Sequence, residues 1–121
     1  MPALIDAALD AQERELLDRL ITALVEEYAA DLDAVWLYGS RARGERPHDE
    51  SDIDVLVITR SDRDDQALIP TLWRVLEGLG NPRIFVDPRQ RSRAWVEDRR
   101  TIGSFFLRDV DRDKIVLYSR S

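Results

Sequence analysis

The chain has no cysteine, and it contains one histidine and one methionine in 121 residues. The absence of cysteine excludes disulfides, thiolate zinc sites and thiol catalysis. No apolar run approaches the ~18 residues that a membrane-spanning helix requires. The N-terminus, MPALIDAALD, lacks the basic start and long apolar core of a signal peptide. We therefore expect a cytoplasmic protein without a membrane-bound part.

The chain also lacks an excess of positive charge, because it has 18 lysines and arginines against 24 acidic residues and a net charge of −6. This balance disfavours strong nonspecific binding of nucleic acid, which needs a basic surface. The arginines nevertheless cluster in two places, which are Arg41, Arg43 and Arg46, and later Arg89, Arg91, Arg93, Arg99 and Arg100. Arginine clusters bind anions, so a phosphate-containing ligand is compatible with this chain.

The hydrophobic content of 44% is enough for one modest core, and we expect a single domain over residues 1–121. Apolar residues at helical spacing predict a helix at about 10–30, with Asp10 and Glu13 as a capping box. Apolar runs predict strands at 34–38, 53–59, 83–86 and 115–118. Helices are expected at 72–79 and at about 92–108, and a short one could begin at Ser40.

This order of elements predicts an α/β (α+β) fold in which helices pack on a small mixed β-sheet. The strands are mostly apolar on both sides, which favours helical cover. The core of the fold after the N-terminal helix would span about residues 33–118.

Five Asp-x-Asp pairs occur among the 16 aspartates, so such a pair is weak evidence by itself. The pair Asp52 and Asp54 differs because Asp54 lies inside the apolar strand IDVLVIT. Residues two apart on a strand share a face, and adjacent buried carboxylates repel each other. A divalent cation such as Mg²⁺ would relieve that repulsion. The alternatives are an edge strand with solvated aspartates, or pairing of the aspartates with nearby arginines.

The segment before this pair favours a site. Gly39 and Ser40 directly follow the strand at 34–38, and glycine lets the backbone approach a ligand closely. A helix that begins at Ser40 would present free amides to phosphate. One strand would thus end in an anion site and its neighbour would begin with a metal site, as a nucleoside triphosphate with Mg²⁺ requires.

The combination of Gly39-Ser40, Arg41-Ala42-Arg43-Gly44 and Ser51-Asp52-Ile53-Asp54 closely resembles the minimal nucleotidyltransferase family, small members of the polymerase-β-like superfamily. That family has a third carboxylate on a later strand, and Asp87 in Phe85-Val86-Asp87 fits its place. Eleven residues separate Ser40 from Asp52, one more than the family pattern of about ten.

The resemblance implies a role for each of these residues. Asp52 and Asp54 would hold two Mg²⁺ ions, and Asp87 would join the metal at the acceptor hydroxyl and is a candidate base. Gly39 and Ser40 would hold the phosphates of ATP, and Arg43 and Arg41 would neutralise phosphate charge. His48 is expected to be a solvated loop residue.

The resemblance also implies a partner, because such proteins commonly pair with a helical HEPN protein in toxin–antitoxin systems. We expect an antitoxin that transfers AMP to a tyrosine of the HEPN RNase toxin. The chain ends soon after its last strand, so the acceptor site is expected on that partner. Two alternatives stay open, which are an inactive module that neutralises a partner by contact, and an enzyme acting on a small molecule such as an aminoglycoside.

Overall fold

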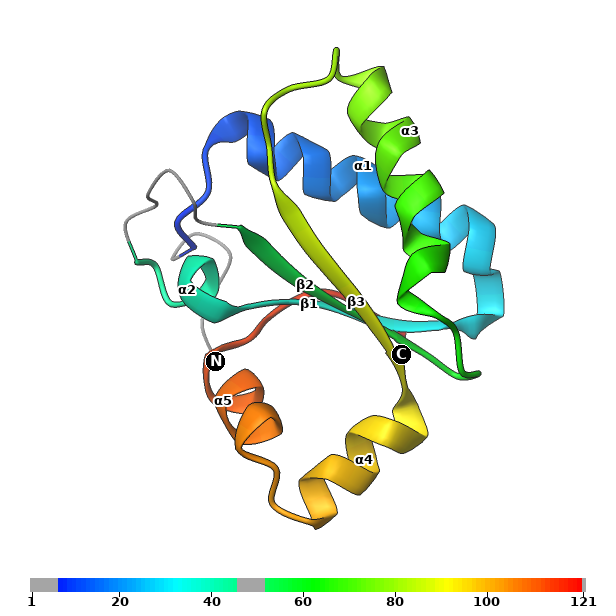
Figure 1. The fold of residues 1–121 in the computed structure, drawn as a ribbon, viewed down its shortest axis with the longest axis vertical. Helices are drawn as coiled ribbons and strands as arrows, with labels where there is room; N and C mark the ends of the chain where they lie inside the picture. Colours follow the sequence, from blue (N-terminus) through cyan, green and yellow to red (C-terminus); the bar gives the residue numbers. More distant parts are fainter. Residues whose placement is uncertain (1–6, 46–51, 121) are drawn as a thin grey trace.

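The computed structural model describes residues 7–45 and 52–120 (Figure 1). His48 and Arg46 lie outside the described residues. The elements in chain order are α1 (Ala11–Tyr28), η2 (Ala29–Asp31), β1 (Leu32–Tyr38), α2 (Gly39–Ala42), β2 (Ile53–Thr59), η3 (Asp65–Leu68), α3 (Ile69–Gly78), β3 (Val86–Ser92), α4 (Arg93–Thr101), α5 (Phe105–Asp113) and β4 (Ile115–Ser119).

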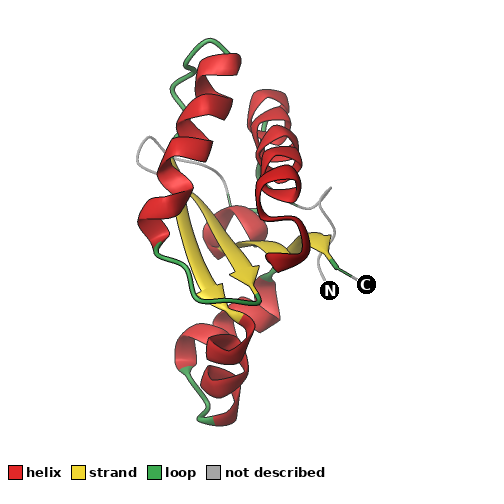
Figure 2. Cartoon of the chain, turned by 90° about the vertical axis from the view of Figure 1, so that its right-hand side faces the viewer, coloured by secondary structure: helices red, strands yellow, loops and turns green. Residues whose placement is uncertain are grey.

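The four strands form one mixed sheet in the order β3-β2-β1-β4. β1 is antiparallel to β2 and to β4, whereas β2 and β3 are parallel. Helices cover both faces, with α1 and α3 on one side and α4 and α5 on the other (Figures 1 and 2). The predicted α+β architecture is therefore confirmed.

Alternation along the strands divides the core into two layers. Val35, Leu37, Val55 and Val57 pack with the leucines of α1. On the other face, Trp36, Tyr38, Leu56 and Ile58 pack with Val96, Leu107 and Val110 of α4 and α5. β1 and β2 are buried on both faces, which explains why their sequences are almost continuously apolar.

Helix α1 follows its sequence pattern closely. Leu16, Leu20, Leu24 and Tyr28 are all buried against the sheet and α3. The predicted capping box is present, because the Glu13 amide donates to Asp10 Oδ1 at 2.7 Å and the Asp10 amide donates to Glu13 Oε1 at 3.0 Å. This arrangement satisfies two of the amides that a helix start leaves free.

The predicted strand at 83–86 is wrong, because β3 begins at Val86 and runs to Ser92. The prediction relied on the apolar run RIFV, but Phe85 in this run is largely exposed and lies outside the strand. β3 itself reads VDPRQRS and carries little apolar signal. It is an edge strand, where charged residues and a proline are tolerated because one side of the strand needs no partner.

The single helix predicted over 92–108 is also wrong, because α4 ends at Thr101 and α5 begins at Phe105. Gly103 has a φ of 73°, a left-handed conformation that interrupts the helix. Ser104 then caps α5 by accepting a hydrogen bond from the Leu107 amide. Two smaller differences are that β1 begins at Leu32 and that α3 begins at Ile69.

A buried polar link joins α1 to the edge strand β3. The Tyr28 hydroxyl donates to Gln90 Oε1 at 2.9 Å, and the Gln90 side-chain amide donates to the Asp64 carbonyl. Gln90 is 1% exposed, so no water replaces these bonds.

None of the helices within residues 7–45 and 52–120 has both the length and the apolar character needed to cross a membrane.

We predict that Tyr28→Phe lowers the free energy of unfolding by about 1–3 kcal/mol, because it leaves the Gln90 carbonyl oxygen buried without a donor. Urea denaturation measures this change. Tyr118→Phe is the matched control, since the Tyr118 hydroxyl has no hydrogen-bond partner among the described residues. Equal unfolding midpoints for the two variants would contradict a stabilising role for the Tyr28 bond.

Candidate active site

The site begins where β1 turns into the single helical turn α2. Gly39 follows β1 directly and has a φ of 75°. A Cβ atom placed on Gly39 would lie 2.3 Å from Asp54 Oδ2, closer than any real contact. The backbone of the turn is therefore packed against the Asp54 carboxylate, and a side chain at position 39 is excluded by both conformation and space.

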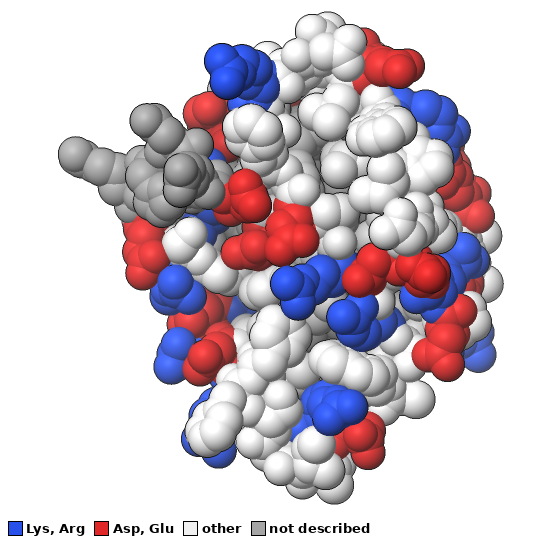
Figure 3. Space-filling model, in the orientation of Figure 1, with Lys and Arg blue, Asp and Glu red and all other residues white. Residues whose placement is uncertain are grey.

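Strand pairing brings the carboxylates together. Asp54 is the register partner of Tyr38 on β1 and of Asp87 on β3. Register partners on neighbouring strands share one face of the sheet, so both carboxylates lie on the face covered by α4 and α5. Asp52 stands just before β2 and is exposed. Acidic side chains gather on the surface over the start of β2 and β3 (Figure 3).

The electrostatics of Asp54 reflect this crowding. Burial raises the pKa of Asp54, and the charges of Asp87 and Asp52 raise it further. Arg89 and Arg43 act in the opposite direction. A carboxylate that is partly desolvated beside two others binds a cation favourably, because the cation offsets both burial and repulsion.

The other Asp-x-Asp pairs have different surroundings. Asp33 accepts from Arg93, and Asp31 accepts from Arg63. Hydrogen bonds from Arg100 hold the pKa of Asp111 down, at about 2, and Lys114 also donates to it. Basic neighbours therefore offset the charges of Asp31, Asp33 and Asp111, whereas the charges of Asp87 and Asp52 raise the pKa of Asp54.

The predicted arginines have two distinct environments. Arg41 is 5% exposed, and one of its terminal nitrogens lies 2.9 Å from each Glu13 carboxylate oxygen and 3.0 Å from the Ala8 carbonyl. The Ala8 amide in turn donates to the Arg41 carbonyl at 2.8 Å. Arg41 thus fastens α2 to the start of α1. We give it a positioning role instead of phosphate binding.

Arg43 is exposed beside α2, so it can contact a ligand. Its guanidinium lies 3.1 Å from Glu45 and 3.5 Å from Asp113, and its charge lowers the pKa of Asp54. Surface pairs of this kind contribute little stability, so a phosphate can displace them. Ser40 is half-buried in the same turn.

Sequence reasoning missed two further residues, Tyr38 and Arg89. Burial raises the pKa of Tyr38 to about 12, and Asp54 and Asp87 add to the rise. Arg89 lies 3.7 Å from Asp87 and lowers the pKa of both Tyr38 and Asp54. A correct placement of β3 would have found Arg89, since residues two apart on a strand share a face.

The donor set fits Mg²⁺ chemically, because three carboxylates supply hard oxygens at one end of the sheet. Within residues 7–45 and 52–120, no three acidic or histidine side chains already stand in a geometry that would hold a metal ion. Asp52 and Asp54 are two residues apart in the chain, so rotation of their side chains sets the distance between their carboxylates.

The comparisons with known proteins agree with this geometry. A family model described as a nucleotidyltransferase domain matches residues 17–114. The chain belongs to this nucleotidyltransferase family. The predicted family and fold are therefore confirmed, and the activity class is transfer of a nucleotidyl group. No curated protein sequence matches the chain.

Solved structures share the nucleotidyltransferase fold at low identity. A toxin–antitoxin MntA-HpeT complex with a tyrosine-to-alanine mutation is 18% identical, with a TM-score of 0.54 over 87% of this chain and 73% of that one. An MntA-HpeT mutant with two aspartates changed to glutamate is 17% identical, with a TM-score of 0.56 over 86% and 73%. A toxin–antitoxin structure with AMP-PNP is 20% identical, with a TM-score of 0.55 over 84% and 73%.

We predict that Gly39→Ala lowers the rate of nucleotidyl transfer by about 100-fold or more, because the new methyl group displaces the Asp54 carboxylate. Gly103→Ala is the matched control, since Gly103 has a φ of 73° and no atom lies within 4 Å of its added Cβ. Both changes carry a similar left-handed penalty of about 1–2 kcal/mol. Similar activity in the two variants would contradict the close approach of Gly39 and Asp54.

We also predict that Asp54→Asn stabilises the metal-free protein at neutral pH. The raised pKa means that ionisation of Asp54 costs the folded state free energy, and this cost appears as pH rises through that pKa. The advantage of the variant should therefore grow as the pH rises from the ordinary aspartate pKa of 3.8 to the raised pKa of Asp54, and then level off. Urea unfolding in EDTA measures it, and a variant less stable than wild type at neutral pH would contradict the prediction.

Proposed function

We propose that this nucleotidyltransferase transfers AMP from ATP to a hydroxyl group of a partner protein, in a reaction that depends on Mg²⁺. We further propose that the partner is a HEPN RNase toxin and that this chain is its antitoxin. The observation that carries the proposal is the register of Tyr38, Asp54 and Asp87, which sets two carboxylates side by side against the Gly39 turn.

Three further features support the choice of substrate and partner. The structures that share the fold include toxin–antitoxin complexes, one of them with AMP-PNP, an analogue of ATP. Another carries changes at two aspartates, the residue type that stands at the centre of this site. The motif Gly39-Ser40 through Asp54 is the one on which the resemblance to antitoxin nucleotidyltransferases rests.

The proposed reaction assigns a task to each side chain. The amides of Gly39 and Ser40 bind the β- and γ-phosphates, and Arg43 neutralises part of their charge. Asp87 accepts the proton of the acceptor hydroxyl. The hydroxyl oxygen then bonds to the α-phosphorus, the bond from that phosphorus to the β-phosphate oxygen breaks, and pyrophosphate leaves with the electron pair.

Asp52, Asp54 and Asp87 are the residues that would hold Mg²⁺. When bound, Mg²⁺ supplies the positive charge that stabilises the attacking and leaving oxygens. Tyr38, the register partner of Asp54, packs its ring against Phe106, with 5.6 Å between the ring centroids. Its raised pKa keeps the hydroxyl neutral at physiological pH, so it adds no further negative charge beside the carboxylates.

The test is transfer of label from α-labelled ATP to the protein encoded by the adjacent reading frame, in the presence of Mg²⁺. We expect label on that protein and a loss of about 100- to 1,000-fold for Asp52→Asn and Asp54→Asn, because each removes charge that the transition state needs. Asp62→Asn is the matched control, since Asp62 is an exposed aspartate of another Asp-x-Asp pair.

The toxin's RNase activity distinguishes the proposal from neutralisation by contact. If the two site variants suppress the toxin as well as wild type does, the chain is a binding module and the enzymatic proposal fails. Label on an added aminoglycoside, with none on the neighbouring protein, would make a small molecule the acceptor.

A further inference from the structure

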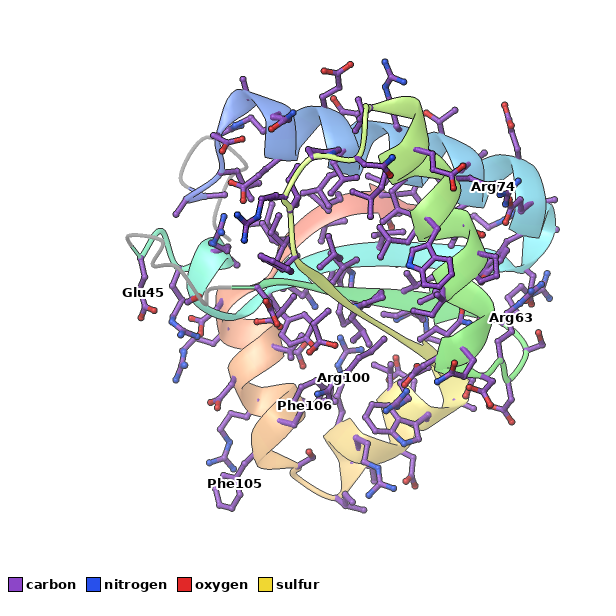
Figure 4. All side chains as sticks on the ribbon, turned by 45° about the horizontal axis from the view of Figure 1, so that its top comes forward. Glu45, Arg63, Arg74, Arg100, Phe105 and Phe106 are labelled. Atoms are coloured by element: carbon purple, nitrogen blue, oxygen red, sulfur yellow. The ribbon has the colours of Figure 1, made fainter. Side chains whose placement is uncertain are left out.

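A pocket of about 350 Å³ opens between the sheet and helices α4 and α5. Three arginines and two aromatic residues line it, namely Arg89, Arg91, Arg99, Trp95 and Phe106. Figure 4 shows Phe106 in the space between the sheet and the two helices, whereas Phe105 points outward. The pocket is thus basic in a chain whose net charge is −6.

This pocket continues the row of carboxylates along β3. Arg89 and Arg91 follow Asp87 at two-residue intervals, and their register partners on β2 are Leu56 and Ile58. All of these side chains share the face covered by α4 and α5. Basic side chains lie directly beside the acidic group over β3 (Figure 3).

The position of the pocket separates it from the phosphate turn. Gly39 follows the end of β1, and β2 lies between β1 and β3. Neighbouring strands are about 4.8 Å apart, so the turn and the pocket lie on opposite sides of Asp54. A ligand in the pocket would lie beside Arg89, two residues along β3 from Asp87.

The chemistry of the lining favours an anion. Arg99 Nε is buried and has no hydrogen-bond partner among the described residues. Arg89 lies 3.7 Å from Asp87, which is too long for a hydrogen bond. Arginine donors of this kind match the oxygens of a carboxylate, and a buried donor without a partner gains most from such a ligand.

The covering of the Trp95 ring argues against a nucleobase in this pocket. Its volume of about 350 Å³ would admit a base, so the covering of the aromatic ring decides. The Trp95 ring is already covered, since the guanidinium carbons of Arg91 and Arg99 both lie 5.3 Å from its centroid. A base could stack on Trp95 only by displacing an arginine, whereas a carboxylate can bind with both arginines in place.

We propose that this pocket binds an acidic segment of the acceptor protein, next to the hydroxyl that receives the nucleotide. Arg99 and Arg89 hold its carboxylates, and the Trp95 ring holds the Arg99 guanidinium in position. This assignment rests on the proposed transfer to a protein hydroxyl and adds the feature by which the enzyme selects its acceptor.

The test uses a fluorescein-labelled peptide, Glu-Glu-Tyr-Glu-Glu, and its glutamine analogue, with binding followed by fluorescence anisotropy. We expect the acidic peptide to bind wild type at least 10-fold more tightly, and Arg99→Gln and Arg89→Gln each to weaken that binding about 10-fold. Arg19→Gln, on α1 at the opposite face of the sheet, is the matched control. Thermal melting verifies that each variant folds, and the exposed Arg89 can be changed without loss of packing.

Nucleotide binding, measured separately with labelled ATP and Mg²⁺, separates this proposal from the proposed function. If wild type binds the acidic peptide but no ATP, the transfer proposal fails and the pocket assignment stands. If wild type binds both peptides equally, the acidic acceptor is refuted. If Arg99→Gln weakens ATP binding and leaves peptide binding unchanged, the pocket belongs to the nucleotide and the proposal is overturned.

Discussion

The strand pairing around Asp54 is the constraint on which the rest of the site depends. Three side chains, Tyr38, Asp54 and Asp87, stand in one row because β1, β2 and β3 pair in a single register. A slip of one residue would turn every side chain of β2 to the opposite face. The apolar positions on both faces of β1 and β2 prevent that slip, so the hydrophobic core holds in place a row of carboxylates that repel one another.

The arginines around this row divide between structure and chemistry. Arg41 is buried against Glu13 and fixes the turn that carries Gly39, while Arg43 two residues later is exposed. A buried arginine with a paired carboxylate is costly to disturb, whereas an exposed pair exchanges readily for a ligand. The motif Arg41-Ala42-Arg43 therefore contains one buried arginine that anchors α2 and one exposed arginine that is available to a ligand.

The sequence was sufficient for the elements whose burial produces a regular pattern. α1 and β2 were predicted almost to the residue, because the spacing of their apolar residues reflects direct contact with the core. β3 was misplaced because its stability comes from backbone pairing at the sheet edge, and Pro88, Arg89 and Arg91 leave no apolar period. The break at Gly103 was underestimated, since a single glycine is compatible with a helix unless its conformation is known.

For the site, the sequence predicted the carboxylates but could not decide between the two arginines. Arg41 and Arg43 have the same chemistry, and the difference arises from which of them faces Glu13, a residue 28 positions away from Arg41. Arg89 and Tyr38 were missed for a related reason, because their importance follows from cross-strand neighbours. Local sequence motifs thus predict the candidate site carboxylates, and long-range pairing identifies the residues that change their pKa.

Glu13 has a consequence that reaches beyond the pair it forms. Its carboxylate accepts from the Asp10 amide at the start of α1 and from Arg41 beneath the Gly39 turn. We therefore expect fraying of the first turn of α1 to be coupled to loosening of the Gly39 turn through the Glu13 side chain. Any ligand that orders the turn should slow hydrogen exchange at the amides of α1, so the helix end serves as a remote indicator of occupancy at the site.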